Sequence, residues 1–154
     1  MARGNRNITS ANATAILTVD NAFPAGIIFE YFSSDQSFAG DEIEIAETKM
    51  GVDGKMHAGW IPAERNVTFT FSPDSPTIIF LEELIAVQNV AKNVYFCDLP
   101  ITVPSIGKLY HYTNGVLKKT KMLPDGKKTL DPVSYTFTFE DMKVTPISTA
   151  ALGA

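Results

Sequence analysis

Residues 66–76 read NVTFTFSPDSP, and this stretch decides the fold class. Its first six residues alternate between polar and apolar types, which is the period of a β-strand with one buried face. Ser75 and Pro76 then form a favoured pair at a helix start. The serine hydroxyl can cap free amide groups, and a proline at the first helical position loses no hydrogen bond. The stretch therefore predicts a strand that leads directly into a helix.

The segment after Pro76 has the spacing of an amphipathic helix. Ile78, Leu81, Leu84 and Ile85 fall on one face, whereas the acidic residues lie elsewhere and near the helix start, where the helix dipole favours anions. We predict one helix over about 75–91, with its apolar stripe packed against a sheet.

The rest of the chain consists of short apolar runs bounded by turn residues. Seven or so strands, separated by turns every 8–12 residues, predict a mainly β protein: a β-sandwich or half-barrel with one flanking helix. The 154 residues fit a single domain, 1–154, in which 1–13 read as a flexible arm. Besides 66–72, the expected strands are 14–19, 27–32, 41–47, 55–61, 94–97, 101–103 and 133–140.

Two dipeptides predict tight hairpin turns. Asp53-Gly54 lies between the expected strands 41–47 and 55–61, and Asn114-Gly115 lies between 108–113 and 116–122. Neither face of the second hairpin is cleanly apolar. We therefore predict that 105–131 form a hairpin extension, a protruding β-hairpin arm that packs on another subunit, with Lys119 opposite Tyr110 and Leu117 opposite Tyr112.

Charge is unevenly distributed along the chain. Between residues 20 and 54 eight acids stand against one lysine, a net of −7, and between 108 and 128 six lysines stand against one acid, a net of +5. These segments are either two solvated faces or the two sides of a head-to-tail contact between subunits, in which charge sets partner and register. The candidate inter-subunit contact residues are Asp41, Glu42, Glu44, Glu47, Lys118, Lys119, Lys121, Lys127 and Lys128.

Signals for catalysis or cofactor binding are absent. The single Cys97 excludes an internal disulfide and a zinc site built on paired cysteines, and its apolar surroundings predict a buried thiol. No local signature supports a nucleophile pair of Cys97 with His57 or His111. The acids in 41–47 lack the spacing of a calcium loop and read as a solvated strand face. We expect no catalytic, cofactor or metal site and no enzymatic activity.

The net charge and the lengths of the apolar runs argue against two classes of partner, nucleic acids and membranes. The net charge of −4 and the pI near 5.1 argue against tight nucleic-acid binding. No apolar run approaches the ~18 residues of a membrane span, and no apolar stretch follows the N-terminal arginines as in a secretory signal. We therefore expect no membrane association.

Residues 47–60, ETKMGVDGKMHAGW, followed by 66–76, resemble the tail tube proteins of contractile-tailed phages. In that family a Gly-x-Asp-Gly turn precedes a strand. A threonine-rich strand then runs into Ser-Pro and a helix with Leu-x-x-Leu, a place taken here by Ser75-Pro76 and residues 81–84. The resemblance covers about 41–92, extends to 133–140, and is weak at the N-terminus and across 105–131.

The resemblance implies a structural function in the virion. Six subunits would form a ring that stacks into or onto the tail tube, DNA would pass through the lumen without specific binding, and assembly would occur in the host cytoplasm. The implied partners are other copies, sheath, tube and baseplate hub. An alternative within the family is a tube-initiator or adaptor ring that joins tube, sheath and baseplate hub.

A hypothesis from another class is a carbohydrate-binding β-sandwich module. Trp60, Tyr110 and Tyr112 could serve as sugar platforms, although such aromatic residues also occur in cores and interfaces.

Overall fold

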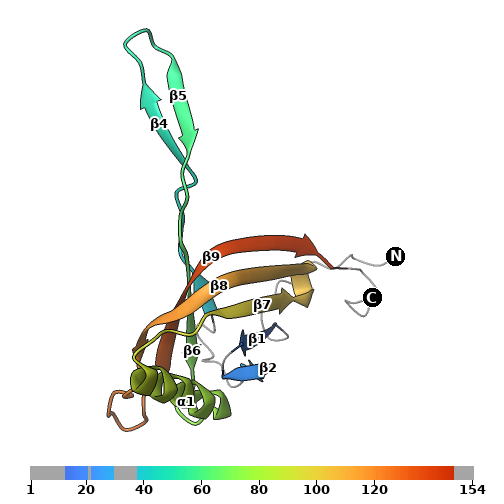
Figure 1. The fold of residues 1–154 in the computed structure, drawn as a ribbon, viewed down its shortest axis with the longest axis vertical. Coiled ribbons are helices and arrows are strands. Elements are labelled where there is room, and N and C mark those ends of the chain that lie inside the picture. The colour runs from blue at the N-terminus through green and yellow to red at the C-terminus, as the bar shows by residue number, and fades with distance from the viewer. Residues whose placement is uncertain (1–12, 21, 30–37, 148–154) are drawn as a thin grey trace.

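A computed structural model of the chain describes residues 13–20, 22–29 and 38–147. Within them, one antiparallel seven-stranded sheet has the order β2-β1-β7-β8-β9-β6-β3, and β4 and β5 form a separate two-stranded sheet (Figure 1). The elements are β1 Thr14–Val19, β2 Phe23–Ile28, β3 Phe38–Gly40, β4 Ala46–Met50, β5 Met56–Trp60, β6 Arg65–Phe71, α1 Pro76–Ala91, β7 Cys97–Val103, the 3-10 turn η1 Pro104–Ile106, β8 Lys108–Lys121 and β9 Val133–Pro146.

The large sheet is rolled into a half-barrel. β2 is one edge strand and β6 lies next to the other edge, yet the ring of Phe29, just after β2, lies 4.8 Å from Phe69 and 5.3 Å from Phe71 of β6. α1 covers the opening between these edges, and the hydroxyl of Thr77 donates a hydrogen bond to the carbonyl oxygen of Ile28 at 2.8 Å. The predicted mainly β fold with one flanking helix is confirmed.

The core lies on the concave side of this sheet, under α1. Its strands bury every second residue, as in β6, where Val67, Phe69 and Phe71 are at most 1% exposed. Across the pairing of β6 with β9, Phe69 lies opposite Tyr135, Phe71 opposite Val133 and Val67 opposite Phe137. Each of these buried side chains contributes about 1.5–3 kcal/mol. The other core residues come from β1, β2 and the residue after it, α1, β7 and β9: Ala15, Leu17, Val19, Ile27, Phe29, Ile78, Leu81, Leu84, Cys97, Leu99, Ile101, Val103 and Phe139.

The helix begins and ends as its sequence predicts. Ser75 is extended, and its hydroxyl oxygen accepts a hydrogen bond from the backbone N–H of Thr77 at 3.3 Å. At the other end Lys92 adopts the left-handed conformation (φ 52°), and its N–H caps the carbonyl oxygen of Gln88. The predicted range of about 75–91 is confirmed.

The prediction of a hairpin at Asn114-Gly115 is wrong. β8 runs unbroken from Lys108 to Lys121 and pairs with β7 on one side and β9 on the other. Asn114 is left-handed (φ 52°), and the pairing of β7 with β8 shifts by one residue beside it, which marks a bulge. Lys119 accordingly lies opposite Thr136, and Leu117 opposite Phe137. The extension at 105–131 is thus no arm, because its strand lies inside the sheet.

The protruding arm is the hairpin of β4 and β5. Its turn at Asp53-Gly54 is confirmed: Gly54 has a φ of 81°, and the Gly51 N–H donates to the carbonyl oxygen of Lys55 at 2.8 Å. The expected half-buried strand at 41–47 is wrong, because residues 41–45 are outside any strand and Ile45 is 60% exposed. The Glu/Ile alternation therefore does not correspond to a buried strand face among the described residues: Ile43 is half-buried and Ile45 is exposed.

Prolines account for two further differences in strand boundaries. Pro100 does not separate two short strands but lies inside β7, where the registers Ala15↔Ile101 and Thr18↔Asp98 continue across it. β2 begins earlier than predicted, at Phe23, and Pro24 is tolerated because β2 is an edge strand. Residues 30–32 of that expected strand, and 1–12 of the expected N-terminal arm, lie outside the described residues.

Gly115 gives a test of the bulge in β8. A Cβ atom on this residue would lie 2.1 Å from Cδ1 of Phe139, so Gly115→Ala is expected to lower the free energy of unfolding by about 2–3 kcal/mol in urea denaturation. Gly59→Ala is the control, because nothing lies within 4 Å of its Cβ. Equal stability of the two variants would contradict this packing.

Candidate assembly surface

The arm formed by β4 and β5 extends away from the half-barrel along the long axis of the molecule (Figure 1). All five residues of each strand are exposed. At its base, backbone hydrogen bonds join the N–H of Ile61 to the carbonyl oxygen of Ile45 at 3.3 Å, and the N–H of Asp41 to the carbonyl oxygen of Asn66 at 3.0 Å. A two-stranded hairpin by itself is marginally stable in water, and this arm has no further strand beside it among the described residues.

The arm has one apolar and one charged face, because directly paired residues share a face. The pair Met50↔Met56 lies on the same face as Ala46↔Trp60, whereas Lys49↔His57 lies on the opposite face. Met50 is 66% exposed, Met56 63% and Trp60 79%. We call the side formed by Ala46, Thr48, Met50, Met56, Ala58 and Trp60 the apolar arm face, and Val52 stands at its tip.

A second uncovered apolar surface lies on α1, on the side that faces away from the core. It carries Ile79, Val87 and Val90, of which Val90 is 87% exposed, and a shallow depression of about 350 Å³ lies along it beside Tyr95. Sequence reasoning found only the buried stripe of this helix. The missed signal was the scarcity of polar residues in IIFLEELIAVQNVA, because a surface helix normally has one polar side. We call Ile79, Glu83, Ala86, Val87 and Val90 the outer face of α1.

The acidic candidates all belong to the arm and its base. Asp41, Glu42 and Glu44 lie in the segment that leads to β4, Glu47 lies on the charged side of the arm, and all four are exposed. In the described part of the chain, no ion pair joins any of them to a lysine. Their charges are therefore available to another molecule.

Three of the five candidate lysines form ion pairs with acidic residues of the same chain. Lys118 pairs with Glu64 at 3.3 Å, Lys121 with Asp125 at 2.8 Å and Lys127 with Asp131 at 3.0 Å. The hydrogen bond from Lys121 lowers the pKa of Asp125, and the bond to Asp131 raises the pKa of Lys127. Exposed pairs of this kind contribute little stability. Lys119 on β8 and Lys128 in the loop before β9 have no such partner among the described residues.

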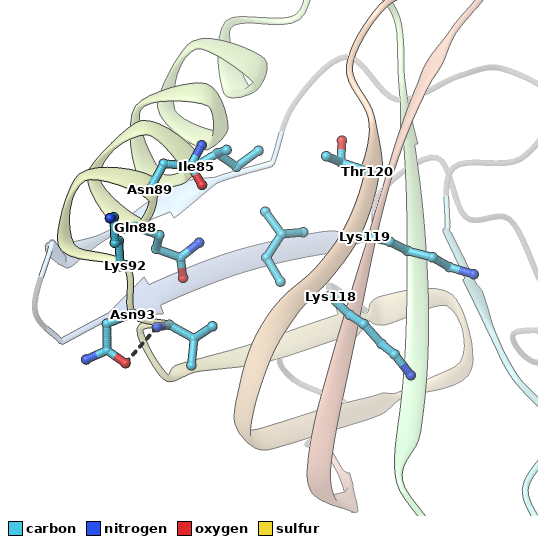
Figure 2. A pocket seen from close by; sticks show the side chains of 10 residues that line it. Ile85, Gln88, Asn89, Lys92, Asn93, Lys118, Lys119 and Thr120 are labelled. Carbon is cyan, nitrogen blue, oxygen red and sulfur yellow. Dashed lines mark hydrogen bonds between the residues drawn. The ribbon is translucent and has the colours of Figure 1, made fainter.

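A hollow of about 580 Å³ lies between the end of α1 and β8, and amide, hydroxyl and lysine side chains line it beside apolar ones (Figure 2). The side chains of Lys118 and Lys119 point away from the helix. The side-chain carbonyl oxygen of Gln88 accepts a hydrogen bond from the backbone N–H of Tyr95 at 2.9 Å. It is therefore already bonded to the backbone. Among the described residues that line the hollow, the charged ones are Lys92, Lys118 and Lys119, and no acidic side chain is one of them.

The aromatic residues of the carbohydrate hypothesis differ in their surroundings. Trp60 stands exposed on the arm, whereas Tyr110 and Tyr112 are half-buried against the core. The Tyr112 ring lies 5.1 Å from that of Phe139, and burial raises the pKa of its hydroxyl. The three rings do not form one exposed platform.

Cys97 is a packing residue. It is 3% exposed, its thiol donates to the carbonyl oxygen of Gly115 at 3.3 Å, and burial raises its pKa to about 12.

The two histidines lie far from each other in the sheet pairing. His57 lies on β5 of the arm, and His111 lies on β8, opposite Pro100 of β7. Within residues 13–20, 22–29 and 38–147, no group of three or more His, Cys, Asp or Glu side chains could hold a metal ion. No helix in the same ranges is long and apolar enough to cross a membrane.

The burial of Cys97 predicts a protected thiol. At pH 9 the folded chain is expected to react with a thiol reagent only as fast as it opens, because a pKa of about 12 keeps the group protonated. Stability should fall as the pH rises from about 9 toward 12, since the unfolded chain ionises first. Mass spectrometry of labelled protein with and without urea measures this. Rapid labelling without urea would contradict the buried site.

Comparison with known proteins identifies the family of the chain. A family model described as "Tail fiber protein gp32" matches residues 6–143. The chain belongs to this family of tail proteins. No curated protein matches the chain.

Solved structures from contractile injection systems share the fold. A chain of the anti-feeding prophage tube-terminating cap is 12% identical, with a TM-score of 0.59 over 95% of this chain and 99% of that one. A chain of the PVC sheath/tube terminator in its extended state is 13% identical, with a TM-score of 0.60 over 85% and 92%. A chain of the anti-feeding prophage baseplate is 8% identical, with a TM-score of 0.58 over 92% and 97%. The resemblance predicted from residues 47–76 is confirmed for family and fold.

Proposed function

We propose that this chain is a non-enzymatic structural subunit of a contractile tail, and that it acts by assembling with copies of itself and with other tail proteins. The observation that carries the proposal is the arm, whose ten strand residues are all exposed and whose apolar face has no cover. The family and the fold shared with cap, sheath–tube and baseplate complexes support the same role.

The assembly we propose is a hexameric ring that stacks into or onto a tail tube. The arm and α1 lie toward opposite ends of the molecule, so the two uncovered surfaces are unlike and separated (Figure 1). Contacts between unlike surfaces are heterologous, and they generate rings or open stacks. In this proposal DNA passes through the ring without specific binding, in keeping with the net charge of −4.

The charged residues are proposed to set the register between subunits. In this contact lysines of one subunit attract the acidic residues of the next: Asp41, Glu42, Glu44 and Glu47. The attraction is stronger for Lys119 and Lys128, which form no ion pair among the described residues. It is weaker for Lys118, Lys121 and Lys127, whose charges are already paired. Since this attraction acts between exposed groups, assembly should weaken as salt rises.

The copy number in purified tail particles tests the proposal. Quantitative mass spectrometry is expected to detect the chain together with sheath, tube or baseplate proteins. More than about a hundred copies per particle would indicate a repeating tube, and about six would indicate the alternative, a single adaptor or terminator ring. Absence from the particles, together with a monomer at high concentration, would contradict a structural tail role.

A further inference from the structure

We propose that the hollow at the base of the arm is a binding site for a neutral saccharide. A ligand site goes beyond the proposed structural role, and it stands or falls independently of that role. The hollow has a volume of about 640 Å³, which is within the range of small-molecule sites. It is lined by residues at the end of β5, around the start of β6, at the bulge in β8 and in the middle of β9: Trp60, Glu64, Arg65, Asn114, Glu140 and Asp141.

The indole ring of Trp60 supplies the apolar part of the site. Trp60 is 79% exposed at the end of β5, so one face of its ring can receive a ligand. The face of an aromatic ring is negative, and a pyranose ring has a flat face of C–H groups with slight positive charge. A sugar ring can therefore stack on Trp60, without the half-buried Tyr110 and Tyr112 that the sequence also suggested.

Arg65 supplies hydrogen-bond donors that have no acceptor. Its Nη1 donates to the carbonyl oxygen of Ala63 at 2.7 Å, which holds the half-buried guanidinium at the wall of the hollow. Its Nε is buried and has no hydrogen-bond partner among the described residues, and no carboxylate of these residues forms an ion pair with the guanidinium. Because buried polar groups are normally bonded, this orphaned donor indicates a place where a ligand completes the site.

The carboxylates of Glu140 and Asp141 supply acceptors in the same hollow. One oxygen of Glu140 accepts a hydrogen bond from the side-chain amide of Asn114 at 3.1 Å, and one oxygen of Asp141 accepts from the backbone N–H of Met142 at 2.8 Å. Neither acid forms an ion pair within the part of the chain that the structure describes. Asn114 is the left-handed residue of the β8 bulge, and a bulge commonly redirects a side chain toward a site in this way.

The hydroxyl group is the ligand chemistry that uses both kinds of partner. It donates to a carboxylate and accepts from a guanidinium, whereas a lysine or arginine side chain has no acceptor for Arg65. A carboxylate ligand has no donor and would meet Glu140 and Asp141 as like charges. A peptide backbone has both groups, but it has no flat apolar face for the indole ring.

The charge of the site is small enough for a neutral ligand. The lining acids Glu64, Glu140 and Asp141 stand against Arg65, a net of −2. Lys118 pairs with Glu64 at 3.3 Å and reduces this net to −1. These groups are largely exposed and screened by salt, so charge alone selects no ion strongly. A ligand with several hydroxyl groups and one apolar face, a saccharide, therefore fits best.

Tryptophan fluorescence of the purified full chain tests the site, because Trp60 is the only tryptophan. Titration with maltotriose, cellotriose and triacetylchitotriose is expected to give a saturable change in emission with at least one of these neutral sugars. Pentalysine and trigalacturonate, the cationic and anionic probes, should give none. A response to either charged probe, or to none of the five compounds, would overturn the assignment.

Variants locate the bound sugar by calorimetry with the trisaccharide that gives the largest response. Trp60→Ala should weaken binding about tenfold or more, and so should Arg65→Lys, which keeps the charge but loses the planar fork. Met50→Ala is the matched control, because Met50 lies on the same arm face, is 66% exposed and does not line the hollow. It should bind like the wild type.

Urea denaturation of the same preparations checks the fold. Trp60→Ala and Met50→Ala should keep the wild-type midpoint, since both side chains are exposed. Wild-type affinity of Trp60→Ala, or equal losses in Trp60→Ala and Met50→Ala, would show that the sugar does not bind in this hollow.

Discussion

A chain in which residues 45–61 are replaced by a short glycine–serine linker is expected to fold normally and to fail completely in assembly. The free energy of unfolding should change by less than about 0.5 kcal/mol, because the removed strand residues are all exposed and belong to no part of the core. The chain ends left by the deletion, Glu44 and Pro62, are close together, since the adjoining residues Ile45 and Ile61 share a backbone hydrogen bond of 3.3 Å.

Urea denaturation and sedimentation velocity of the same preparations separate stability from assembly. His57→Gln is the control, because it changes the charged side of the arm and leaves the apolar arm face intact. This variant should assemble like the wild type. Normal assembly of the deletion variant would show that the arm is not the interface, and loss of folding would show that the arm supports the core.

Phe137→Ala is expected to lower the free energy of unfolding by about 3–5 kcal/mol, a large part of the 5–15 kcal/mol typical of a domain. Phe137 is fully buried on β9, and its ring lies 6.0 Å from both Phe29 and Phe69. Phe29 follows the edge strand β2, so this side chain helps to join the two edges of the rolled sheet. Its removal leaves a cavity where the half-barrel closes.

Phe96→Ala is the matched control for this prediction. Phe96 is 59% exposed, and truncating it should cost less than about 0.5 kcal/mol in the same urea titration. A loss below about 1 kcal/mol for Phe137→Ala would show that the two edges of the sheet are not joined through this cluster.

Patterns confined to one element were predicted well from the sequence. The alternation in β6 and β9 and the pair Ser75-Pro76 each depend on neighbours a few residues away. The structure has β6 and α1 with nearly the expected bounds, and β9 begins at the expected Val133 but continues past residue 140 to Pro146. The Asp53-Gly54 turn was also predicted, because its geometry needs only a glycine with a positive φ.

Features that depend on distant partners were not predicted. Asn114-Gly115 has the composition of a tight turn, but β7 and β9 offer hydrogen bonds on both sides, so the chain continues and uses Asn114 for a bulge. The Glu/Ile alternation at 41–45 has the period of a half-buried strand, but within the described residues this segment belongs to no strand and Ile45 is exposed. The location of the arm was therefore assigned to the wrong segment.

The same distinction between local and long-range features applies to the assembly surface. The sequence by itself determined a mainly β fold with one helix, and the separation of acidic from basic segments. Only the tertiary structure decided that the β4–β5 hairpin projects and that one side of α1 stays uncovered, because exposure depends on which elements reach a surface. Local periodicity determines which residues share a face, and the long-range packing of the rolled sheet determines which of those faces is left for a partner.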